Sequence, residues 1–313
     1  MHLEARSPTD RGARSVFLAA VRANDPVCRD HYRLILALAG FPSAQPGQFV
    51  QILCADPEGP PWAGGAFTRR PFSIGGLRRT GNDCELDIIY RVIGPGTKWL
   101  AGLRPGVQVS VLGPLGRPFE LPADRPVAYL VGGGVGLPPM IWLAEVAAAV
   151  GRQVVAFCGA RSADSLPLRP RGRQDAVPLS PTEPTLCMEE FAQWGVPAVV
   201  CTDDGTLGRR GRVPEVFTSY LASHADEAAQ AVVYTCGPEP MLRLVARSCE
   251  LLGIPCQVCL ERTMACGMGT CQSCVVRIRD ASDAQGWRYQ LCCTDGPVFD
   301  SRAVVWQDEK WGT

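Results

Sequence analysis

Four cysteines near the C-terminus restrict what this chain can fold into more than any other feature. Cys266, Cys271 and Cys274 fall within nine residues, and Cys293 follows after a short polar stretch. Two glycines stand between the first and the second of these cysteines, and glycine allows a tight loop whose backbone N–H groups turn inward. We therefore expect three thiols to converge from one loop and the fourth to come from a separate hairpin.

The spacing C-x4-C-x2-C with a distant fourth cysteine is typical of plant-type [2Fe-2S] proteins, whose cluster carries one electron at a time. A zinc site built from two C-x2-C pairs, at 256–259 and 271–274, is the alternative, but it leaves Cys266 and Cys293 without a role. Disulfide frameworks belong to short secreted chains, whereas this chain has 313 residues and its first residues lack the apolar core of a secretory leader. We expect a [2Fe-2S] cluster, with the other cysteines as reduced thiols of a cytoplasmic protein.

Charge and hydropathy argue against two classes of partner. The chain carries 31 basic and 31 acidic side chains, so it offers no basic field for nucleic acid and no polybasic tail for a membrane surface. Residues 127–150 are apolar and numerous enough to cross a bilayer, but three consecutive glycines and the pair Pro138-Pro139 interrupt them. We interpret this stretch as a buried strand, a glycine turn and a helix, and expect no membrane and no nucleic acid as partner.

From about residue 127 onward, strands alternate with helices. The expected strands are 127–131, 153–159, 198–202 and 231–236, and the expected helices run to about residue 150 and over 241–252. This alternation predicts an open parallel sheet, whose ligands bind beyond the carboxyl ends of its strands. The loops 132–136, 203–205 and 236–241 fall at such ends, and a glycine turn before a helix suits a pyrophosphate. No Walker lysine follows, so we expect a nucleotide site without ATPase activity.

The first 120 residues follow a different pattern. Short alternating runs broken by Gly and Pro, at 32–38, 48–53, 84–92 and 107–112, predict an antiparallel barrel. The turns at 70–73, 90–92, 94–97 and 113–116 carry arginines, a strand-end tyrosine and a Gly-Thr helix start. Such groups suit a cofactor with a diphosphate, although ordinary hairpin turns with surface arginines would have the same appearance.

The order of these motifs resembles that of the ferredoxin–NADP reductase superfamily and, in detail, that of the electron-transfer subunits of NAD-dependent (class 1B) dihydroorotate dehydrogenase. The resemblance spans roughly residues 15–305 and is carried by RPFSI, YRVIGPGT, GPLG, the TDDG loop, CGPEPM, MACGMGTCQSCVV and CTDGPVF. It implies a multidomain fold of α/β plus β class. The implied parts are an extension without fixed structure at 1–14, an FAD-binding antiparallel β-barrel at 15–122, a parallel α/β NAD-binding domain at 123–252 and a small [2Fe-2S] domain at 253–313.

The same resemblance implies a set of cofactor-binding residues. For FAD they are Arg70, Pro71, Phe72, Ser73 (near the reactive flavin nitrogen), Ile89, Tyr90, Arg91, Gly96 and Thr97, and for NAD they are Gly132, Gly133, Gly134, Gly136, Cys236 and Gly237. The implied cluster ligands are Cys266, Cys271, Cys274 and Cys293. Adjacent strand residues face opposite ways, so only one of Cys292 and Cys293 can reach the metal. The family register, in which the ligand stands directly before T-D-G-P-V-F, selects Cys293.

The partner implied by the resemblance is a catalytic (FMN) subunit that oxidises dihydroorotate to orotate in pyrimidine (UMP) biosynthesis, within a heterotetramer of two copies of each chain. Nicotinamide exchanges two electrons at once and the cluster exchanges one, so the FAD must lie between them. The only histidines are His2, His31 and His224, and neither paired carboxylates nor a Ser–His–Asp set is evident. We therefore expect an oxidoreductase chain without an acid–base catalyst of its own.

Two other functions remain open from the sequence. One is an NAD(P)H–ferredoxin or hydrogenase-linked reductase subunit of the same superfamily, and the other is a zinc-stabilised nucleotide sensor with no redox role. The residues also leave the nucleotide open, because Asp203 and Asp204 suit a ribose 2′-hydroxyl whereas Arg161, Arg209 and Arg210 suit a 2′-phosphate. The resemblance favours NAD.

Overall fold

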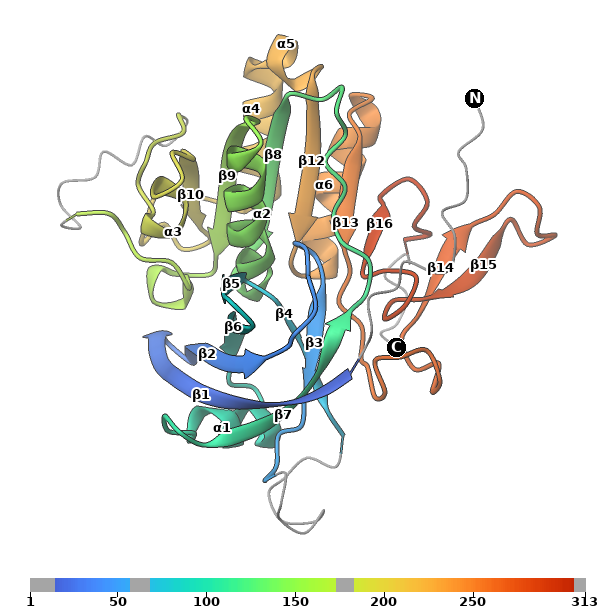
Figure 1. Cartoon of the computed structure of the whole chain (residues 1–313). Helices are drawn as coiled ribbons and strands as arrows, with labels where there is room; N and C mark the ends of the chain where they lie inside the picture. Colours follow the sequence, from blue (N-terminus) through green and yellow to red (C-terminus); the bar gives the residue numbers. More distant parts are fainter. Residues whose placement is uncertain (1–14, 57–67, 173–182, 307–313) are drawn as a thin grey trace.

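The computed structural model describes residues 15–56, 68–172 and 183–306. Within these ranges the chain forms two seven-stranded sheets and a two-stranded hairpin (Figure 1). One sheet is antiparallel and the other is mainly parallel, as expected for a fold that combines a β part with an α/β part. The extension expected at residues 1–14 lies outside the described residues.

The antiparallel sheet is built by the first part of the chain. Its strands are β1 (Ser15–Cys28), β2 (His31–Ala39), β3 (Phe49–Ile52), β4 (Arg70–Ser73), β5 (Gly76–Thr80), β6 (Asp83–Arg91) and β7 (Gln108–Leu115), in the order β4-β3-β7-β1-β2-β6-β5. Alternate residues such as Leu34, Leu36 and Val50 face one apolar core. The order ends at β4 and β5, which form no ladder with each other in the described residues. A short helix, α1 (Pro95–Ala101), follows β6.

Strand β1 was not expected from the sequence. Asn24, Asp25 and Pro26 interrupt any apolar alternation in its second half. It forms because its first half pairs with β7 and its second half pairs with β2. Cross-strand partners supplied by the fold thus outweigh the low strand propensity of these residues. The long, curved β1 is visible at the base of the molecule in Figure 1.

The second sheet contains the parallel strands expected after residue 127. Its strands are β8 (Val127–Gly133), β9 (Gln153–Ala160), β10 (Ala198–Thr202), β11 (Arg209–Arg210), β12 (Ala231–Cys236), β13 (Cys256–Cys259) and β16 (Val298–Asp300), in the order β11-β10-β9-β8-β12-β13-β16. Only β16, at one edge, runs antiparallel to its neighbour. Strands β8, β10 and β12 are buried on both faces, which explains their near-continuous apolar sequences.

Helices cover both faces of this sheet (Figure 1). The helices are α2 (Leu137–Ala149), α3 (Glu189–Ala192), α4 (Val213–Ser223), α5 (Ala225–Ala228) and α6 (Glu239–Leu251), with 3-10 turns at Gly134–Gly136 and Ala163–Ser165. Leu130 of β8 packs with α2 and α3 in one core, whereas Tyr129 packs with α4 and α6 in the other. The strand period of two residues therefore separates the two helical layers.

The apolar stretch 127–150 divides as expected, into β8, a 3-10 turn and α2. Pro138 and Pro139 stand in the first turn of α2, where a missing N–H costs no hydrogen bond. Among the described residues, no helix has both the length and the apolar character needed to span a membrane.

The C-terminal segment is continuous with the parallel sheet. Strand β13 pairs with β12 and with β16, so residues 256–259 and 298–300 belong to the sheet that carries the helices. The boundary expected at residue 252 therefore does not separate two sheets. Between β13 and β16, the hairpin of β14 (Val275–Arg279) and β15 (Trp287–Leu291) projects from the molecule (Figure 1).

Direct contacts connect the three parts of the chain. Trp142 of α2 is buried in the core of the antiparallel sheet, and Phe49 of β3 is buried in a core that it shares with Cys292 and Cys293. The backbone N–H of Arg117, just after β7, donates to the Gly296 carbonyl at 2.6 Å. The antiparallel sheet thus packs against both the parallel sheet and the C-terminal segment.

Candidate redox site

The loop between β13 and β14, residues 260–274, carries three of the expected cluster ligands, and we call it the cluster loop. Its backbone turns N–H groups toward sulfur, because Met268 and Cys271 both donate to Cys266 Sγ at 3.4 Å. The N–H of Cys293 donates to Cys274 Sγ at 3.4 Å. Donors aimed at sulfur stabilise thiolates and cluster sulfides, so the donor set fits an iron–sulfur cluster.

Cys292 and Cys293 point in different directions, but they lie in the turn after β15 rather than on a strand, so the expected strand alternation is not the cause. The Cys292 thiol is fully buried and donates to the Leu260 carbonyl at 3.3 Å. The Cys293 thiol instead lies against Cys274 and the N–H of Gly269 in the cluster loop. This orientation favours Cys293 as the fourth ligand and gives Cys292 a packing role.

The thiols of Cys271 and Cys293 differ in how readily they ionise. Hydrogen bonds from Ser273, and after them from Cys266, lower the pKa of the exposed Cys271 to about 6. Burial, followed by a hydrogen bond with Cys274, raises the pKa of Cys293 to about 12. In a bound cluster the charge of the iron would stabilise both thiolates. Cys271 marks the edge of the site that faces solvent.

A [2Fe-2S] cluster and a structural zinc ion require different arrangements of thiolates. Among the described residues, no three His, Cys, Asp or Glu side chains converge on a single ion position. A structural zinc ion needs four ligands around one point, whereas each iron of a [2Fe-2S] cluster binds two of the four thiolates. All fifteen cysteines, which lie in the described ranges, carry free thiols.

The two expected flavin motifs come together through aromatic contacts. Phe72 of β4 meets Tyr90 of β6 edge-on, with ring centroids 5.9 Å apart, and Tyr32 stacks on Tyr90 at 5.8 Å. The Tyr90 hydroxyl donates to Asn24 Oδ1 at 3.1 Å, and Asn24 Nδ2 donates to the Leu100 carbonyl at 2.7 Å. This network ties β4, β6 and α1 together around the buried ring of Tyr90.

Other expected flavin residues have internal partners. The Arg70 guanidinium donates to the Thr68 carbonyl at 2.9 Å. The Thr97 hydroxyl accepts the N–H groups of Ile93 at 2.9 Å and Gly94 at 3.1 Å. Thr97 therefore shapes the turn before α1.

The remaining residues expected to bind flavin differ in how far they are buried. Ile89 and Gly96 are buried, and Pro71 and Ser73 are half-buried along β4. Arg91, at the end of β6, reaches a cavity of about 540 Å³ between the two sheets. That cavity is where the flavin segment and the nucleotide loops meet.

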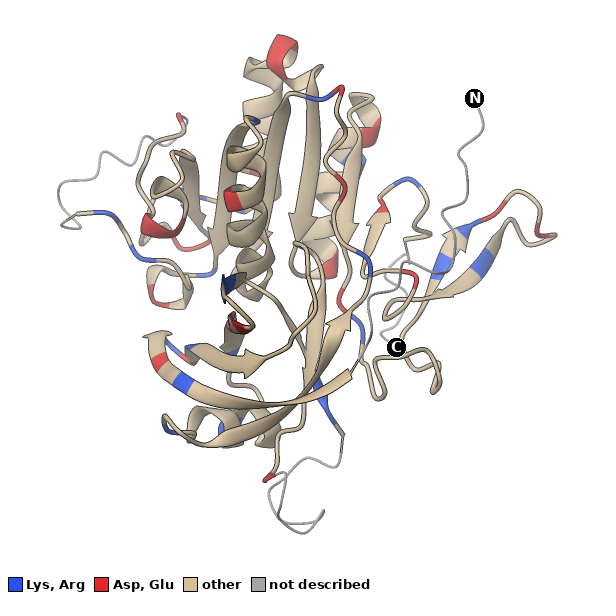
Figure 2. Ribbon diagram, in the orientation of Figure 1, with Lys and Arg blue, Asp and Glu red and all other residues tan. Residues whose placement is uncertain are grey.

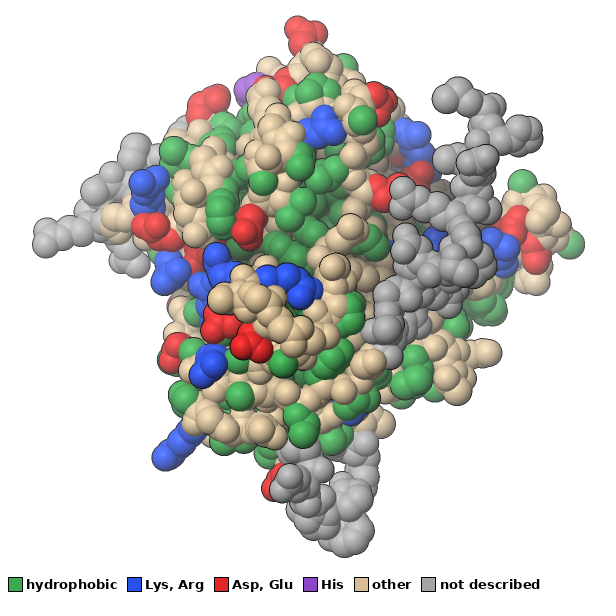
Figure 3. Space-filling view, in the orientation of Figure 1, with side chains coloured by type: hydrophobic (Ala, Val, Ile, Leu, Met, Phe, Trp, Pro, Cys, Tyr) green, Lys and Arg blue, Asp and Glu red, His purple; other side chains and the backbone are tan. Residues whose placement is uncertain are grey.

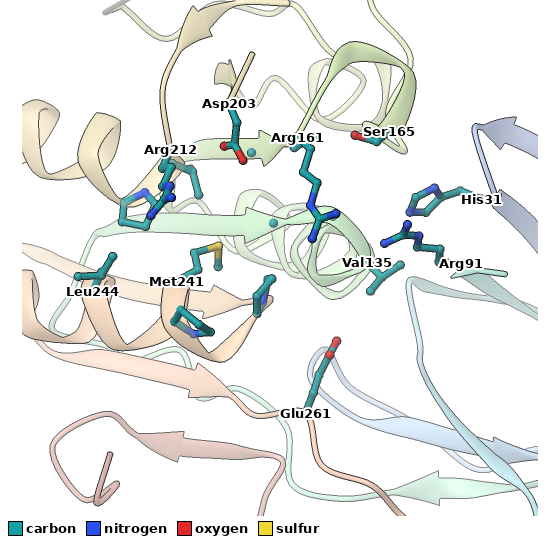
Figure 4. A pocket seen from close by; sticks show the side chains of 18 of the residues that line it. His31, Arg91, Val135, Arg161, Ser165, Asp203, Arg212, Met241, Leu244 and Glu261 are labelled. Atoms are coloured by element: carbon teal, nitrogen blue, oxygen red, sulfur yellow. The ribbon is translucent and has the colours of Figure 1, made fainter. Parts of the chain in front are cut away.

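Loops at the carboxyl ends of the parallel strands form most of the cavity wall. Its lining includes Gly133, Gly134, Arg161, Asp203, Arg212 and Met241. Figure 4 shows Arg161 pointing into the cavity, with Asp203 and Arg212 on one side and Arg91 on the other. A carboxylate and several guanidinium groups thus share one site, which can bind a ribose hydroxyl and a diphosphate at the same time.

The expected nucleotide glycines divide into two roles. Gly133 and Gly134 line the cavity, and Gly134 has a left-handed φ of +55° with open space where a side chain would be. Gly132 and Gly136 are packing positions instead. A Cβ on Gly136 would lie 2.1 Å from the Cys236 carbonyl oxygen, so only glycine lets the loops after β8 and β12 touch.

Sequence reasoning missed part of the cavity wall. Of the expected loop 236–241, Cys236 and Gly237 do not line the cavity, whereas Met241 does. Arg29, His31 and Glu261 also line it, and Figure 4 shows Glu261 pointing upward from the opposite wall. No local motif marks these three residues. The pairing of His31 with Arg91 across β2 and β6 is a signal that could have found His31, and it requires the sheet register.

Basic and acidic side chains are mixed on the face of the molecule shown in Figures 2 and 3. Four arginines nevertheless line the one cavity, at positions 29, 91, 161 and 212. Their convergence makes this the favourable place for an anionic dinucleotide.

Comparison with known proteins identifies the family. A protein of Desulforamulus reducens named dihydroorotate dehydrogenase B (NAD(+)), electron transfer subunit, is 34% identical over 84% of this chain and 88% of its own length. Proteins of the same name from Geobacillus kaustophilus and Caldanaerobacter subterraneus are 37% identical over 83% of the chain and 87% of their own, and 30% identical over 92% and 97%. The chain belongs to this family.

A family model agrees with membership of the electron transfer subunit family, and solved structures share the fold. The family model for the iron-sulfur cluster binding domain of dihydroorotate dehydrogenase B matches residues 261–305, which contain all four expected ligands. An NADH-dependent reduced ferredoxin-NADP oxidoreductase structure aligns with a TM-score of 0.68, 22% identity, and coverage of 92% of this chain and 90% of its own. A cytochrome P450 reductase from Amycolatopsis aligns with a TM-score of 0.58, 24% identity, and coverage of 79% and 70%. These two likenesses concern the fold alone.

Proposed function

We propose that this chain is the electron-transfer subunit through which a dihydroorotate dehydrogenase catalytic chain exchanges electrons with NAD in de novo pyrimidine (UMP) biosynthesis. Its cofactors are FAD, a [2Fe-2S] cluster and NAD, and it is an oxidoreductase. Membership of the electron transfer subunit family, at 30–37% identity over most of the chain, carries this conclusion. The core that Phe49 of the antiparallel sheet shares with Cys292 and Cys293 supports it.

The proposed cofactor sites follow the three parts of the fold. FAD would bind the antiparallel sheet, proposed as a β-barrel over 15–122, between the Phe72–Tyr90 wall and Arg91. NAD would bind the cavity at the carboxyl ends of the parallel strands, in a domain proposed over 123–252. Cys266, Cys271, Cys274 and Cys293 would hold the cluster in the segment 253–313, which shares its β13 and β16 with the parallel sheet.

Bound flavin supplies the conversion between two-electron exchange with nicotinamide and one-electron exchange with the cluster. The chain itself contributes binding, orientation and electrostatics. The arginines of the cavity neutralise the diphosphate, and the backbone N–H groups of Met268, Cys271 and Cys293 stabilise charge on sulfur. Because Cys274 and Cys293 are buried, they would keep water from the side of a bound cluster that they face.

The opposite side of the cluster loop is where we place the partner. Cys271 is exposed, and the apolar side chains of Met268 and Val275 beside it are 49% and 39% exposed. A flavin (FMN)-containing catalytic chain that covers this edge would approach the cluster most closely. We propose a complex of two copies of each chain, located in the cytoplasm.

NAD is the proposed nucleotide because the relatives carry NAD(+) in their names. Asp203, which lines the cavity, can accept a hydrogen bond from a ribose 2′-hydroxyl. Comparing kcat/KM for NADH and NADPH in the purified chain tests this choice, and an equal or higher value for NADPH would contradict it.

Reconstitution with a catalytic chain of the family tests the function as a whole. The pair should oxidise NADH when orotate is supplied, whereas either chain alone should not. The Cys271→Ser variant is the matched control, since it should abolish the orotate-dependent reaction and retain transfer from NADH to a dye. A pair that forms but oxidises NADH only when ferredoxin is added would instead identify a ferredoxin-linked reductase.

A further inference from the structure

A buried amide next to the cluster loop has no partner within the described chain. Gln51 of β3 is 0% exposed, and neither Nε2 nor Oε1 of its carboxamide has a hydrogen-bond partner. Buried polar groups are nearly always satisfied, so an orphaned carboxamide indicates an absent partner or a functional site.

The surroundings of Gln51 connect the two proposed redox sites. On β3, Val50 and Ile52 face the core of the antiparallel sheet. Gln51 therefore faces the other way, on the side where Phe49 packs against the C-terminal segment. In the ladder with β4, its cross-strand neighbour is Pro71 of the proposed flavin motif.

On the other side, the carboxamide lies against the cluster loop. A Cβ built on Gly267 would lie 2.7 Å from Gln51 Nε2 and 2.7 Å from its Cγ. Gly267 has a φ of +72°, and the absence of a side chain there allows the loop to pack directly on the amide. Gly267 follows Cys266, whose Sγ already accepts two backbone N–H groups.

We propose that Gln51 is a positioning residue that donates a hydrogen bond from Nε2 to a sulfur of the bound [2Fe-2S] cluster and thereby raises its reduction potential. This inference rests on the proposed function. The amide packs on Gly267, the residue next to the expected ligand Cys266, where the sulfurs of a bound cluster would offer acceptors. A donor to sulfur stabilises the reduced cluster, which carries the additional negative charge.

This arrangement couples the flavin sheet to the cluster. The donor comes from β3, which also pairs with the strand of the flavin motif, so the cluster potential would depend on how the antiparallel sheet docks on the cluster loop. The N–H groups supplied by the loop itself have no such dependence.

The test is the midpoint potential of the cluster in Gln51→Leu, measured by EPR-monitored redox titration of the holoprotein. We expect the equilibrium constant for reduction of the cluster to fall by about tenfold. This corresponds to a midpoint potential that is lower by about 59 mV for a one-electron couple. Gln51→Met, which also lacks the N–H but keeps an unbranched side chain, should show the same shift and covers the case in which the leucine variant does not fold. The EPR line shape should change in parallel.

Thr235→Val is the matched control. The Thr235 hydroxyl is likewise fully buried without a partner, but it lies on β12 in the parallel sheet. Removing it should leave the cluster potential unchanged. The cluster-free form of Gln51→Leu should resist thermal unfolding at least as well as the cluster-free wild type, because an orphaned polar group has been replaced by an apolar one.

Unchanged cluster potentials in both Gln51 variants would overturn the proposal. It would also be overturned if the FAD potential moved and the cluster potential did not, since the amide would then bind the flavin. A wild-type protein without any cluster signal would refute the proposed function itself, and this outcome is distinguishable because it precedes any comparison of variants.

Discussion

The contact at Gly136 gives the most quantitative prediction. An alanine Cβ there would lie 2.1 Å from the Cys236 carbonyl oxygen and 2.6 Å from the Gly237 nitrogen, both of which are backbone atoms. Moving the first contact from 2.1 Å to 3.4 Å, where ordinary van der Waals contact begins, requires a displacement of about 1.3 Å between the loops after β8 and β12. Both loops contribute to the cavity proposed to bind NAD.

A displacement of about 1 Å in a substrate-positioning element can cost about 100-fold in rate, or about 2.7 kcal/mol of transition-state stabilisation. We therefore expect Gly136→Ala to lower kcat/KM for NADH, measured by transfer to a dye, by about 100-fold. Overpacking should also lower the free energy of unfolding by about 1–3 kcal/mol. FAD and iron contents should not change, because neither proposed site contains these loops.

Gly151→Ala is the matched control, since Gly151 lies at the other end of α2 and has no atom within 4 Å of the added Cβ. Its positive φ of +77° should cost about 1 kcal/mol of stability, with normal kcat/KM for NADH. If Gly136→Ala retained wild-type kcat/KM, the approach of the two loops would not form the nucleotide site, and the reasoning would fail.

Three further predictions concern the cysteines and one histidine. Cys271→Ser should remove the visible absorbance and EPR signal of the cluster but preserve NADH-to-dye transfer, and loss of bound FAD as well would show that the two sites depend on each other. Cys293→Ala should lose the cluster whereas Cys292→Ala should retain it, as iron analysis would report; the reverse result would exchange their roles. Burial is the main cause that lowers the pKa of His31, so the unfolded chain binds a proton there at a higher pH than the folded chain does. The free energy of unfolding should therefore fall as the pH drops through about 6.5. Urea unfolding at pH 7.5 and 5.5 should show a smaller fall for His31→Gln, and an identical fall would contradict this assignment.

Strands buried on both faces were predictable from the sequence. The runs Ala198–Thr202 and Ala231–Cys236 were expected with the bounds that the structure shows. Their continuous apolar character leaves few alternatives once helices flank them. Strand β1 was missed because its partners, not its own residues, determine its conformation.

Residues that act through tertiary contacts were harder to predict from the sequence. Gln51 stands in a strand where alternation would place it toward solvent, yet the cluster loop covers that face. Arg29, His31 and Glu261 reach the cavity from segments without a motif. The choice between Cys292 and Cys293 likewise depends on which thiol meets Leu260 and which meets Cys274.

Anaerobic titration of the purified chain with NADH tests the central claim most directly, because it examines nucleotide, flavin and cluster in one experiment. The account predicts a coloured protein that contains one FAD and two irons per chain, whose flavin absorbance is bleached by NADH while the EPR signal of a reduced [2Fe-2S] cluster develops. An iron-free protein, or one whose flavin is bleached by excess NADH without any such signal, would contradict it.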